Sequence, residues 1–454
     1  MLNDYSSLYY DIFLLYRNYH TFITYNNFNI KIISYNNKND LFYKKKLMTI
    51  QVFEHQTLRI GQCANFTERI WEAMIRFNDL YKQRYFVIVH RGVRFRHYVG
   101  VLQIGQLTIE ILPKADKEEN ANKNHWQSVL ISMLKTCRLL KIESLSNAQL
   151  RLQQHFILDL YFELFLQEVE KLLHEGLIKK YKNITENHSV MRGRMDFSKQ
   201  IQHNIIHKTR FFVEHSTYDF DHLLNQILSQ TISVLQRIVT NPLLLDKLQR
   251  LRLYFPKVKN INAQPYHFHH LQFDRKSQRY RTALEISRLI LLNYSPDIRG
   301  GNHDVLAMLF DMNVLFETFI FRQLKRLEYS ENIEVIGQPS RKFWTNPKSS
   351  RNLRPDILIQ KEGENIILDT KWKVLKRLSP NDEDLRQMYA YANIFNANKT
   401  ILIYPKVFDF QNFESGIFNQ DRQQNQLTCD LLFVNVADEN GLNPKVGAEV
   451  LKYC

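Results

Sequence analysis

The sequence predicts a multi-domain α+β protein with a β-rich block first, helices in the middle and an α/β module last. A chain of 454 residues is too long for one hydrophobic core, so two or three domains are expected. Short β-branched and aromatic runs, separated by turn residues, fill 48–115. Apolar residues recur every three or four positions through 124–182 and 220–295, which is typical of amphipathic helices.

The composition divides the chain into four segments. Residues 1–47 are rich in Tyr and Asn, and we interpret them as an upstream reading-frame extension that is not native, with Met48 as the natural start; a genuine Tyr-rich tail is the alternative. Residues 48–190 are predicted to form a β-rich, barrel-like domain with helices. Residues 191–300 are expected to be a mainly helical connecting region. The Pro and paired Gly of YSPDIRGGN then mark the start of a C-terminal α/β domain, residues 301–454.

The C-terminal domain has its own predicted order of elements. A long helix is expected over 304–328, then a strand at IEVIGQ and a loop at SRKFWTNPKSSRNLR. Strands PDILIQ and IILDTKWK follow as a hairpin, and a helix is predicted over 382–396. Strands TILIYP and LLFVNV complete an α/β pattern.

Charge and cysteine content narrow the class of protein. The net charge of +15 suits a polyanionic partner such as nucleic acid or an anionic membrane surface. Four scattered cysteines without a C-x-x-C pair argue against a disulfide framework, and they favour a reducing, cytoplasmic compartment. No apolar run is long enough to predict a transmembrane helix, so no membrane partner is expected. The sequence has no G-x-x-x-x-G-K-[ST] motif, so any nucleotide-driven motor would be another polypeptide.

The predicted hairpin brings together the residues that are most capable of chemistry. Asp356 begins its first strand and Asp369 lies late in its second, with Lys371 on the same face and the Thr370 side chain pointing away. The alternative is a solvated hairpin with ordinary surface charges. The apolar ILI and IIL runs beside the charges favour a buried hairpin instead. Burying a charge costs free energy unless the charge is paired or binds a metal, so these charges are expected to have a function.

Two carboxylates held close together repel each other and attract a cation. Their hard oxygen ligands select Mg²⁺ or Mn²⁺, so Asp356, Asp369 and the backbone carbonyl of Thr370 are the predicted metal ligands. A bound metal polarises a phosphodiester oxygen and lowers the pKa of a coordinated water. Lys371 could stabilise developing negative charge or orient that water. Pro355-Asp356, twelve residues, and then Asp369-Thr370-Lys371 form the PD-(D/E)xK pattern of metal-dependent nucleases.

Helices on either side of the hairpin add possible catalytic residues. Glu317 lies off the polar face of the helix predicted over 304–328, and members of this nuclease superfamily often supply an acid from such a helix; a Glu at the edge of the apolar stripe is the alternative. Gln387 and Tyr391 stand four residues apart in the second helix. They match a Q-x-x-x-Y element that lines the DNA side of RecB-like sites, or they are an ordinary Gln and a half-buried Tyr.

Two other groups carry weaker signals. His267, His269 and His270 could bind a metal, but no acid or cysteine is arranged around them, which favours a polar strand. Arg192 and Arg194 flank a glycine and could either contact phosphate or hold a turn.

The order of several motifs resembles the McrC family, the nuclease subunits of McrBC 5-methylcytosine-dependent restriction systems. The resemblance covers residues 50–440 and rests on VGVLQIGQLTIEILPKAD, MRGRMDFSKQI, FDHLLNQIL, MNVLFETFIFRQL, RPDILIQ…IILDTKWK and DLRQMYAYANIF. It implies an Mg²⁺-dependent endodeoxyribonuclease that cuts double-stranded DNA. Carried over by motif, the family's catalytic set falls on Asp356, Asp369 and Lys371.

The resemblance also implies a partner. McrB is an AAA+ GTPase hexamer that recognises methylated cytosine and translocates DNA, and GTP would be bound by it rather than by this chain. McrC-like proteins insert their N-terminal region into the ring and stimulate GTP hydrolysis, a role that falls here on residues 48–190. Two alternatives stay open: a RecB-like nuclease with a different motor, and a catalytically silent regulatory subunit that activates the GTPase.

Overall fold

The computed structural model forms two compact units, Met1–Lys46 and Leu47–Cys454. In the first unit the described part is an antiparallel hairpin of β1 (Thr21–Asn26) and β2 (Asn29–Ser34). The prediction of a natural start at Met48 concerns a segment mostly outside the described residues, and it stays a prediction. The structure describes residues 21–26, 29–34, 48–114, 122–139, 157–296, 304–375, 379–407, 411–418, 427–439 and 441–454.

The second unit begins with a five-stranded sheet that is buried on both faces. Its strand order is β12-β13-β7-β8-β3, and only the β3–β8 pair is parallel. Alternate residues of β7 enter different cores: Val99 and Val101 pack with helices α3 and α5, whereas Leu102 and Ile104 pack with α2. The bounds are β3 (Met48–Phe53), β7 (Tyr98–Ile104), β8 (Leu107–Leu112), β12 (Tyr294–Ser295), β13 (Val305–Asp311), α2 (Glu68–Leu80), α3 (Lys123–Thr136) and α5 (Ile157–His174).

The remaining strands of the N-terminal block form a small antiparallel sheet. It contains β4 (Thr57–Arg59), β6 (Gly92–Phe95) and β5 (Phe86–Val89) in that order. The predicted barrel is therefore wrong: the described strands of this block form two open sheets, and the unpredicted helix α2 packs into the core between them. Helix α2 shares that core with strands of both sheets, so the strands can bury their apolar faces without closing into a barrel.

Helices cover the other face of the first sheet, as the apolar periodicity predicted. α5 is buried around most of its circumference, which matches its almost wholly apolar sequence. His267 caps the short helix α9 by accepting a hydrogen bond from the Gln264 backbone, so the histidine cluster lies on a helix and not on a polar strand. The bounds are α7 (Leu223–Ile238), α8 (Pro242–Tyr254), α9 (Pro265–His269), the 3₁₀ helix η1 (Gln278–Tyr280) and α10 (Arg281–Asn293).

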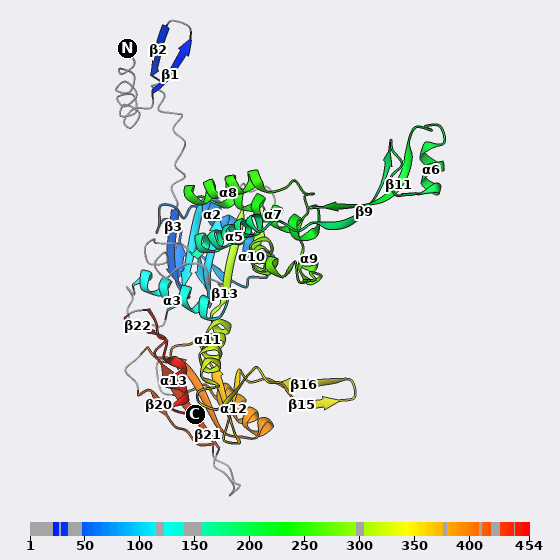
Figure 1. Cartoon of the computed structure of the whole chain (residues 1–454). Helices are drawn as coiled ribbons and strands as arrows, with labels where there is room; N and C mark the ends of the chain where they lie inside the picture. The colour runs from blue at the N-terminus through cyan, green and yellow to red at the C-terminus, as the bar shows by residue number, and fades with distance from the viewer. Residues whose placement is uncertain are drawn as a thin grey trace, which may run out of the picture. The chain divides into compact units, whose positions relative to one another are not determined.

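A long antiparallel arm interrupts the helical region and was not predicted. It consists of β9 (Lys180–His188) and β11 (Phe211–Asp219), with β10 (Arg194–Met195) and α6 (Phe197–Asn204) between them in sequence (Figure 1). Gly193 has a φ of +76°, and a Cβ there would lie 2.4 Å from the Glu214 carbonyl oxygen. Arg192 and Arg194 therefore flank a tight turn, the second of their two predicted roles.

The C-terminal region is built on a six-stranded mixed sheet, ordered β14-β17-β18-β19-β21-β20, with β18, β19 and β21 parallel. Ile357 and Ile359 pack against α11 on one face, and Leu358 packs against α12 on the other. The bounds are β14 (Glu334–Gly337), β17 (Ile357–Lys361), β18 (Glu364–Thr370), β19 (Ala397–Pro405), β20 (Phe413–Glu414), β21 (Thr428–Val434), β22 (Ala437–Asp438), β23 (Gly441–Leu442), α11 (Met312–Leu327), α12 (Asp382–Phe395) and α13 (Val446–Leu451).

Two predictions for this region are wrong. Residues 305–311 form β13 in the first sheet, and the helix predicted over 304–328 begins only at Met312, where Asp311 caps it (Figure 1). A short apolar run cannot be assigned to strand or helix by periodicity alone. The predicted loop is a hairpin of β15 (Arg341–Asn346) and β16 (Ser349–Leu353), which shows no alternation because it buries neither face.

None of the described helices has the length and apolar content that crossing a bilayer requires.

Candidate active site

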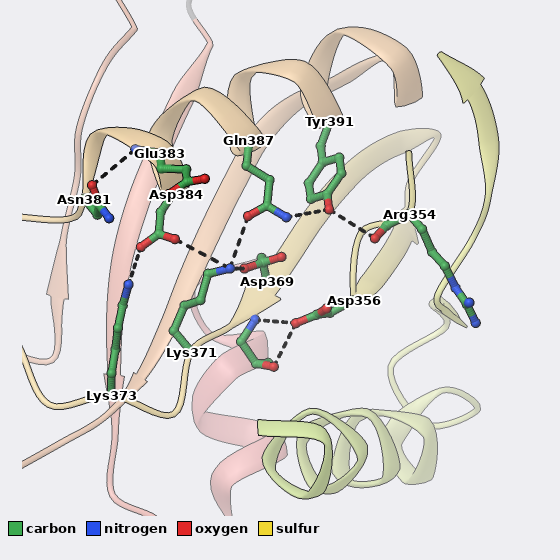
Figure 2. Close-up of polar contacts among 11 residues, drawn as sticks. Arg354, Asp356, Asp369, Lys371, Lys373, Asn381, Glu383, Asp384, Gln387 and Tyr391 are labelled. Carbon is green, nitrogen blue, oxygen red and sulfur yellow. Dashed lines mark hydrogen bonds and ion pairs between the residues drawn. The ribbon is translucent and has the colours of Figure 1, made fainter. Parts of the chain in front are cut away.

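Strand pairing brings the predicted catalytic residues together at one end of the second sheet. β17 and β18 are antiparallel with Ile357 opposite Leu368, and one further step places Asp356 opposite Asp369. Lys371 follows β18 directly, and its backbone N–H donates to the Ile403 carbonyl of β19. Figure 2 shows the side chains of Asp356, Asp369 and Lys371 gathered beneath helix α12.

Asp356 is held by Thr370. Its Oδ2 accepts hydrogen bonds from the Thr370 backbone N–H at 2.7 Å and from the Thr370 hydroxyl at 2.8 Å. Burial raises the pKa of Asp356 above its usual value, although these hydrogen bonds and Lys371 oppose that shift. The expectation that the Thr370 side chain points away is wrong, because Thr370 is the last residue of β18 and the strand alternation ends there.

Asp369 is almost fully buried and forms an ion pair with Lys371. The Lys371 Nζ lies 2.6 Å from Asp369 Oδ2, and the Asp369 residue is 2% exposed. Burial, and then repulsion from Asp356, raise the pKa of Asp369 to about 6 despite the nearby ammonium. Burial opposes the charge of Lys371, but the attraction of Asp369, Asp384 and Asp356 outweighs it and raises the pKa of the lysine.

Helix α12 holds Lys371 in place through Gln387. Gln387 Oε1 accepts from Lys371 Nζ at 3.2 Å, and Gln387 Nε2 donates to the Tyr391 hydroxyl at 2.7 Å. The Tyr391 hydroxyl in turn donates to the Arg354 carbonyl at 3.1 Å (Figure 2). The structure therefore brings Gln387 and Tyr391 into the cluster and links both to the chain that leads into Asp356.

Glu317 reaches the same cluster from α11. Its Oε1 accepts from Gln338 Nε2 at 2.6 Å, and the Gln338 backbone N–H donates to the Asp356 carbonyl at 2.8 Å. Burial, followed by the negative charges of Asp356 and Asp369, raises the pKa of Glu317 to about 7. Three acids therefore share one electrostatic environment.

Three contributors were missed from the sequence. Asp384 pairs with Lys373 and lies 3.7 Å from Lys371 Nζ; it precedes Gln387 by one helical turn, a spacing that could have identified it. The Trp372 indole donates to Glu54 Oε1 at 2.7 Å, across 318 positions of sequence, and no local pattern signals such a contact. Burial raises the pKa of Glu54 to about 7.

The donor set suits a hard divalent cation. Asp356 and Asp369 are buried carboxylates that repel each other, and Mg²⁺ typically binds one or two carboxylates while keeping several waters. In the part of the chain that the structure describes, no three or more His, Cys, Asp or Glu side chains form a ligand group. Water and a backbone carbonyl such as that of Thr370 would have to complete the coordination.

The fold and the cluster define a mixed helix-and-sheet protein that holds a buried group of acids and a lysine at a sheet end. Residues 93–405 match the family described as "McrBC 5-methylcytosine restriction system component". The chain therefore belongs to this family.

Individual relatives agree with that assignment. The chain is 24% identical over 279 residues to the type IV methyl-directed restriction enzyme EcoKMcrBC of Escherichia coli K12, covering 55% of this chain and 77% of the relative. A chain in a structure of Thermococcus gammatolerans McrB AAA+ hexamers with bound McrC has the same fold, with a TM-score of 0.66 and 22% identity over 89% of this chain and 99% of that one.

Proposed function

We propose that this chain is the DNA endonuclease subunit of a GTP-dependent, modified-cytosine-directed restriction complex. One observation carries the proposal: Asp356 and Asp369 lie buried on paired strands beside the Lys371 ammonium, 2.6 Å from Asp369. Such a group needs a cation, and hydrolysis of a phosphodiester bond is a reaction that uses one. Membership of the restriction family supports the same conclusion.

Each residue then has a role. Asp356, Asp369 and the Thr370 carbonyl would hold Mg²⁺ or Mn²⁺, which supplies Lewis acidity and a more acidic water when bound. Lys371 would stabilise negative charge on the phosphate. Gln387 keeps the ammonium in place, Tyr391 positions Gln387, and Glu317 adds a third acid. The resulting list of proposed catalytic residues is Asp356, Asp369, Lys371, Glu317, Gln387 and Tyr391.

The partner we propose is a McrB-type AAA+ GTPase hexamer, which would bind the GTP. The T. gammatolerans assembly, described as McrB hexamers with bound McrC, supports this partner. The surface we propose for the contact includes the arm as well as the N-terminal block, because Phe197, Ile201 and Ile206 on and beside α6 are 72%, 63% and 83% exposed. Apolar side chains gathered on a surface are typical of protein contacts. With its reduced cysteines, such a complex is expected in the cytoplasm.

The test is cleavage of a plasmid containing 5-methylcytosine by the full chain and its McrB-type GTPase, with GTP and Mg²⁺. We expect cleavage that EDTA stops. Asp356→Asn should remove cutting while stimulation of GTP hydrolysis persists, because the variant changes only the metal site.

The alternatives predict other outcomes. A chain that stimulates GTP hydrolysis but never cuts would be a silent regulatory subunit. Efficient cutting without GTP or the partner would indicate a RecB-like nuclease. Cutting by Asp356→Asn at the wild-type rate would refute the proposed site.

A further inference from the structure

The hairpin β15–β16, residues 341–353 and here called the basic hairpin, is held together mainly by its own strands. Every residue of both strands is exposed except Leu353, which is half-buried. At the turn, Asn346 Oδ1 accepts hydrogen bonds from the Lys348 and Ser349 backbone N–H groups. Because both faces of the hairpin are exposed, its surface is available for a ligand. An isolated two-stranded hairpin is only marginally stable, so contacts with a ligand would also stabilise it.

The charge of this hairpin and its flanks is entirely positive. Residues 338–354 contain five basic and no acidic side chains. Among the ion pairs between described residues, none involves Lys342, Lys348 or Arg351. Free cations on an exposed ribbon complement a polyanion. The five basic residues are Arg341, Lys342, Lys348, Arg351 and Arg354.

Aromatic side chains stand among these cations. Phe343 is 56% exposed and Trp344 48% exposed, so neither contributes its full ring to the hydrophobic core. Trp344 is paired directly with Arg351, which places both side chains on one face of the ribbon. The register shifts between Lys342 and Trp344, and this bulge changes the direction of the strand at Phe343. Cations interleaved with exposed aromatics are typical of surfaces that bind nucleic acid backbones and bases.

The residues at the open end of the basic hairpin, Arg341 and Arg354, contact helix α12 and Gln338 beside the candidate active site. Arg341 donates to the Ile394 carbonyl of α12 at 3.1 Å, and its guanidinium lies 4.9 Å from the centre of the Phe395 ring. After β16 the Arg354 guanidinium hydrogen-bonds Gln338, the residue whose amide holds Glu317. Only Arg354 and Pro355 separate β16 from Asp356, so a ligand on the hairpin is brought to the acids.

We propose that the basic hairpin binds duplex DNA and positions the scissile phosphate at the acid–lysine cluster. Lys342, Lys348 and Arg351 contact backbone phosphates, and Trp344 packs against sugars or base edges in a groove. This inference rests on the proposed nuclease function, because it names how that site receives its substrate.

The experiment measures binding of a short fluorescent duplex to the full chain in EDTA, by anisotropy at several salt concentrations. Changing Lys342, Lys348 and Arg351 together to Gln should weaken binding about 100-fold at about 0.15 M salt, and should lower the salt slope by about three. Trp344→Ala should weaken binding about tenfold without changing the slope, because it removes apolar contact area and not charge.

Matched controls remove the same charge and the same kind of ring elsewhere. The triple change of the exposed Lys257, Lys259 and Lys276 to Gln should leave duplex binding within about twofold, as should Tyr254→Ala, a residue 79% exposed on α8. Equal weakening by the control triple would mean that net charge alone drives binding, and it would overturn the proposal.

Two further outcomes decide the remaining alternatives. Hairpin variants that bind DNA normally but no longer capture the McrB-type partner would show a protein-docking hairpin and overturn the proposal. Because EDTA prevents cleavage, the binding result is separate from the proposed nuclease function. Asp356→Asn should bind the duplex at least as tightly as wild type, because it removes a negative charge beside the phosphate; binding that is retained without cleavage separates the two proposals.

Discussion

Two buried carboxylates, one in each large sheet, have opposite surroundings. Glu110 of the first sheet is fully buried and accepts hydrogen bonds from Gln51 Nε2, Gln127 Nε2 and the Ile157 backbone N–H at the start of α5. Asp369 of the second sheet is equally buried, but it faces another carboxylate and one ammonium. Burial raises the pKa of both groups.

The difference separates a structural acid from a candidate catalytic one. Three neutral donors satisfy Glu110, and its charge also suits the N-terminus of α5. Asp369 repels Asp356 at close range, which is an arrangement that folding alone does not favour. The charge of Asp159 also raises the pKa of Glu110 but is the weakest of its causes, whereas Asp356 is second only to burial for Asp369. A buried acid is therefore a better candidate for function when a neighbouring like charge contributes strongly to its raised pKa.

The largest expected effect is on cleavage by a matched pair of variants. Asp369→Asn should lower the single-turnover cleavage rate by about 10³-fold or more, because it removes a proposed metal ligand. Glu110→Gln should leave the rate per folded molecule unchanged. Plasmid cleavage with the GTPase partner measures both rates. A comparable rate loss in Glu110→Gln would show that the surroundings of the two acids do not distinguish a structural role from a catalytic one.

The next effect is on stability. Glu110→Ala leaves the buried Ile157 N–H and the part-buried amides of Gln51 and Gln127 without their acceptor, and it should lower the free energy of unfolding by about 3 kcal/mol. Urea unfolding followed by circular dichroism gives this value. Stability equal to wild type would mean that water replaces the carboxylate, and Glu110 would then not be structural.

A smaller effect concerns pH and Asp369. Its pKa rises from 3.8 to about 6 on folding, so the folded state binds the proton more tightly within that window. In EDTA, stability relative to Asp369→Asn should fall by at most about 3 kcal/mol as pH rises from about 4 to 6, and it should stay constant above. Thermal unfolding of both proteins across this range tests it; parallel curves would contradict the raised pKa.

The smallest effect is expected at Glu317. Glu317→Gln keeps the side-chain shape and one acceptor for Gln338, but it removes a negative charge near the two aspartates. Cleavage should fall about tenfold, as for residues that support a metal site. The loss should be partly recovered at higher Mg²⁺; a loss as large as that of Asp369→Asn would place Glu317 among the direct ligands.

The sequence predicted the centre of the candidate site better than its surroundings. The apolar strands around Asp356 and Asp369 and the i,i+4 pair Gln387 and Tyr391 are local patterns, and the structure has those elements at the expected residues. β13 could not be separated from α11, because its apolar run lacks a strand-specific period. The basic hairpin has no buried face, and the arm buries only isolated residues such as Val213, so neither carries a hydrophobic alternation long enough to detect.

The contact between Trp372 and Glu54 bears on how freely the catalytic segment could be moved between proteins. Trp372 follows Lys371 directly, yet its indole N–H bonds to an acid just after β3, and its ring packs against Phe316 of α11. A fusion that grafts only residues 301–454 onto a new host would leave that indole without its acceptor and would separate β13 from its strand partners β7 and β12. The candidate catalytic region is therefore not structurally independent, and a fusion that keeps it folded must carry the first sheet along.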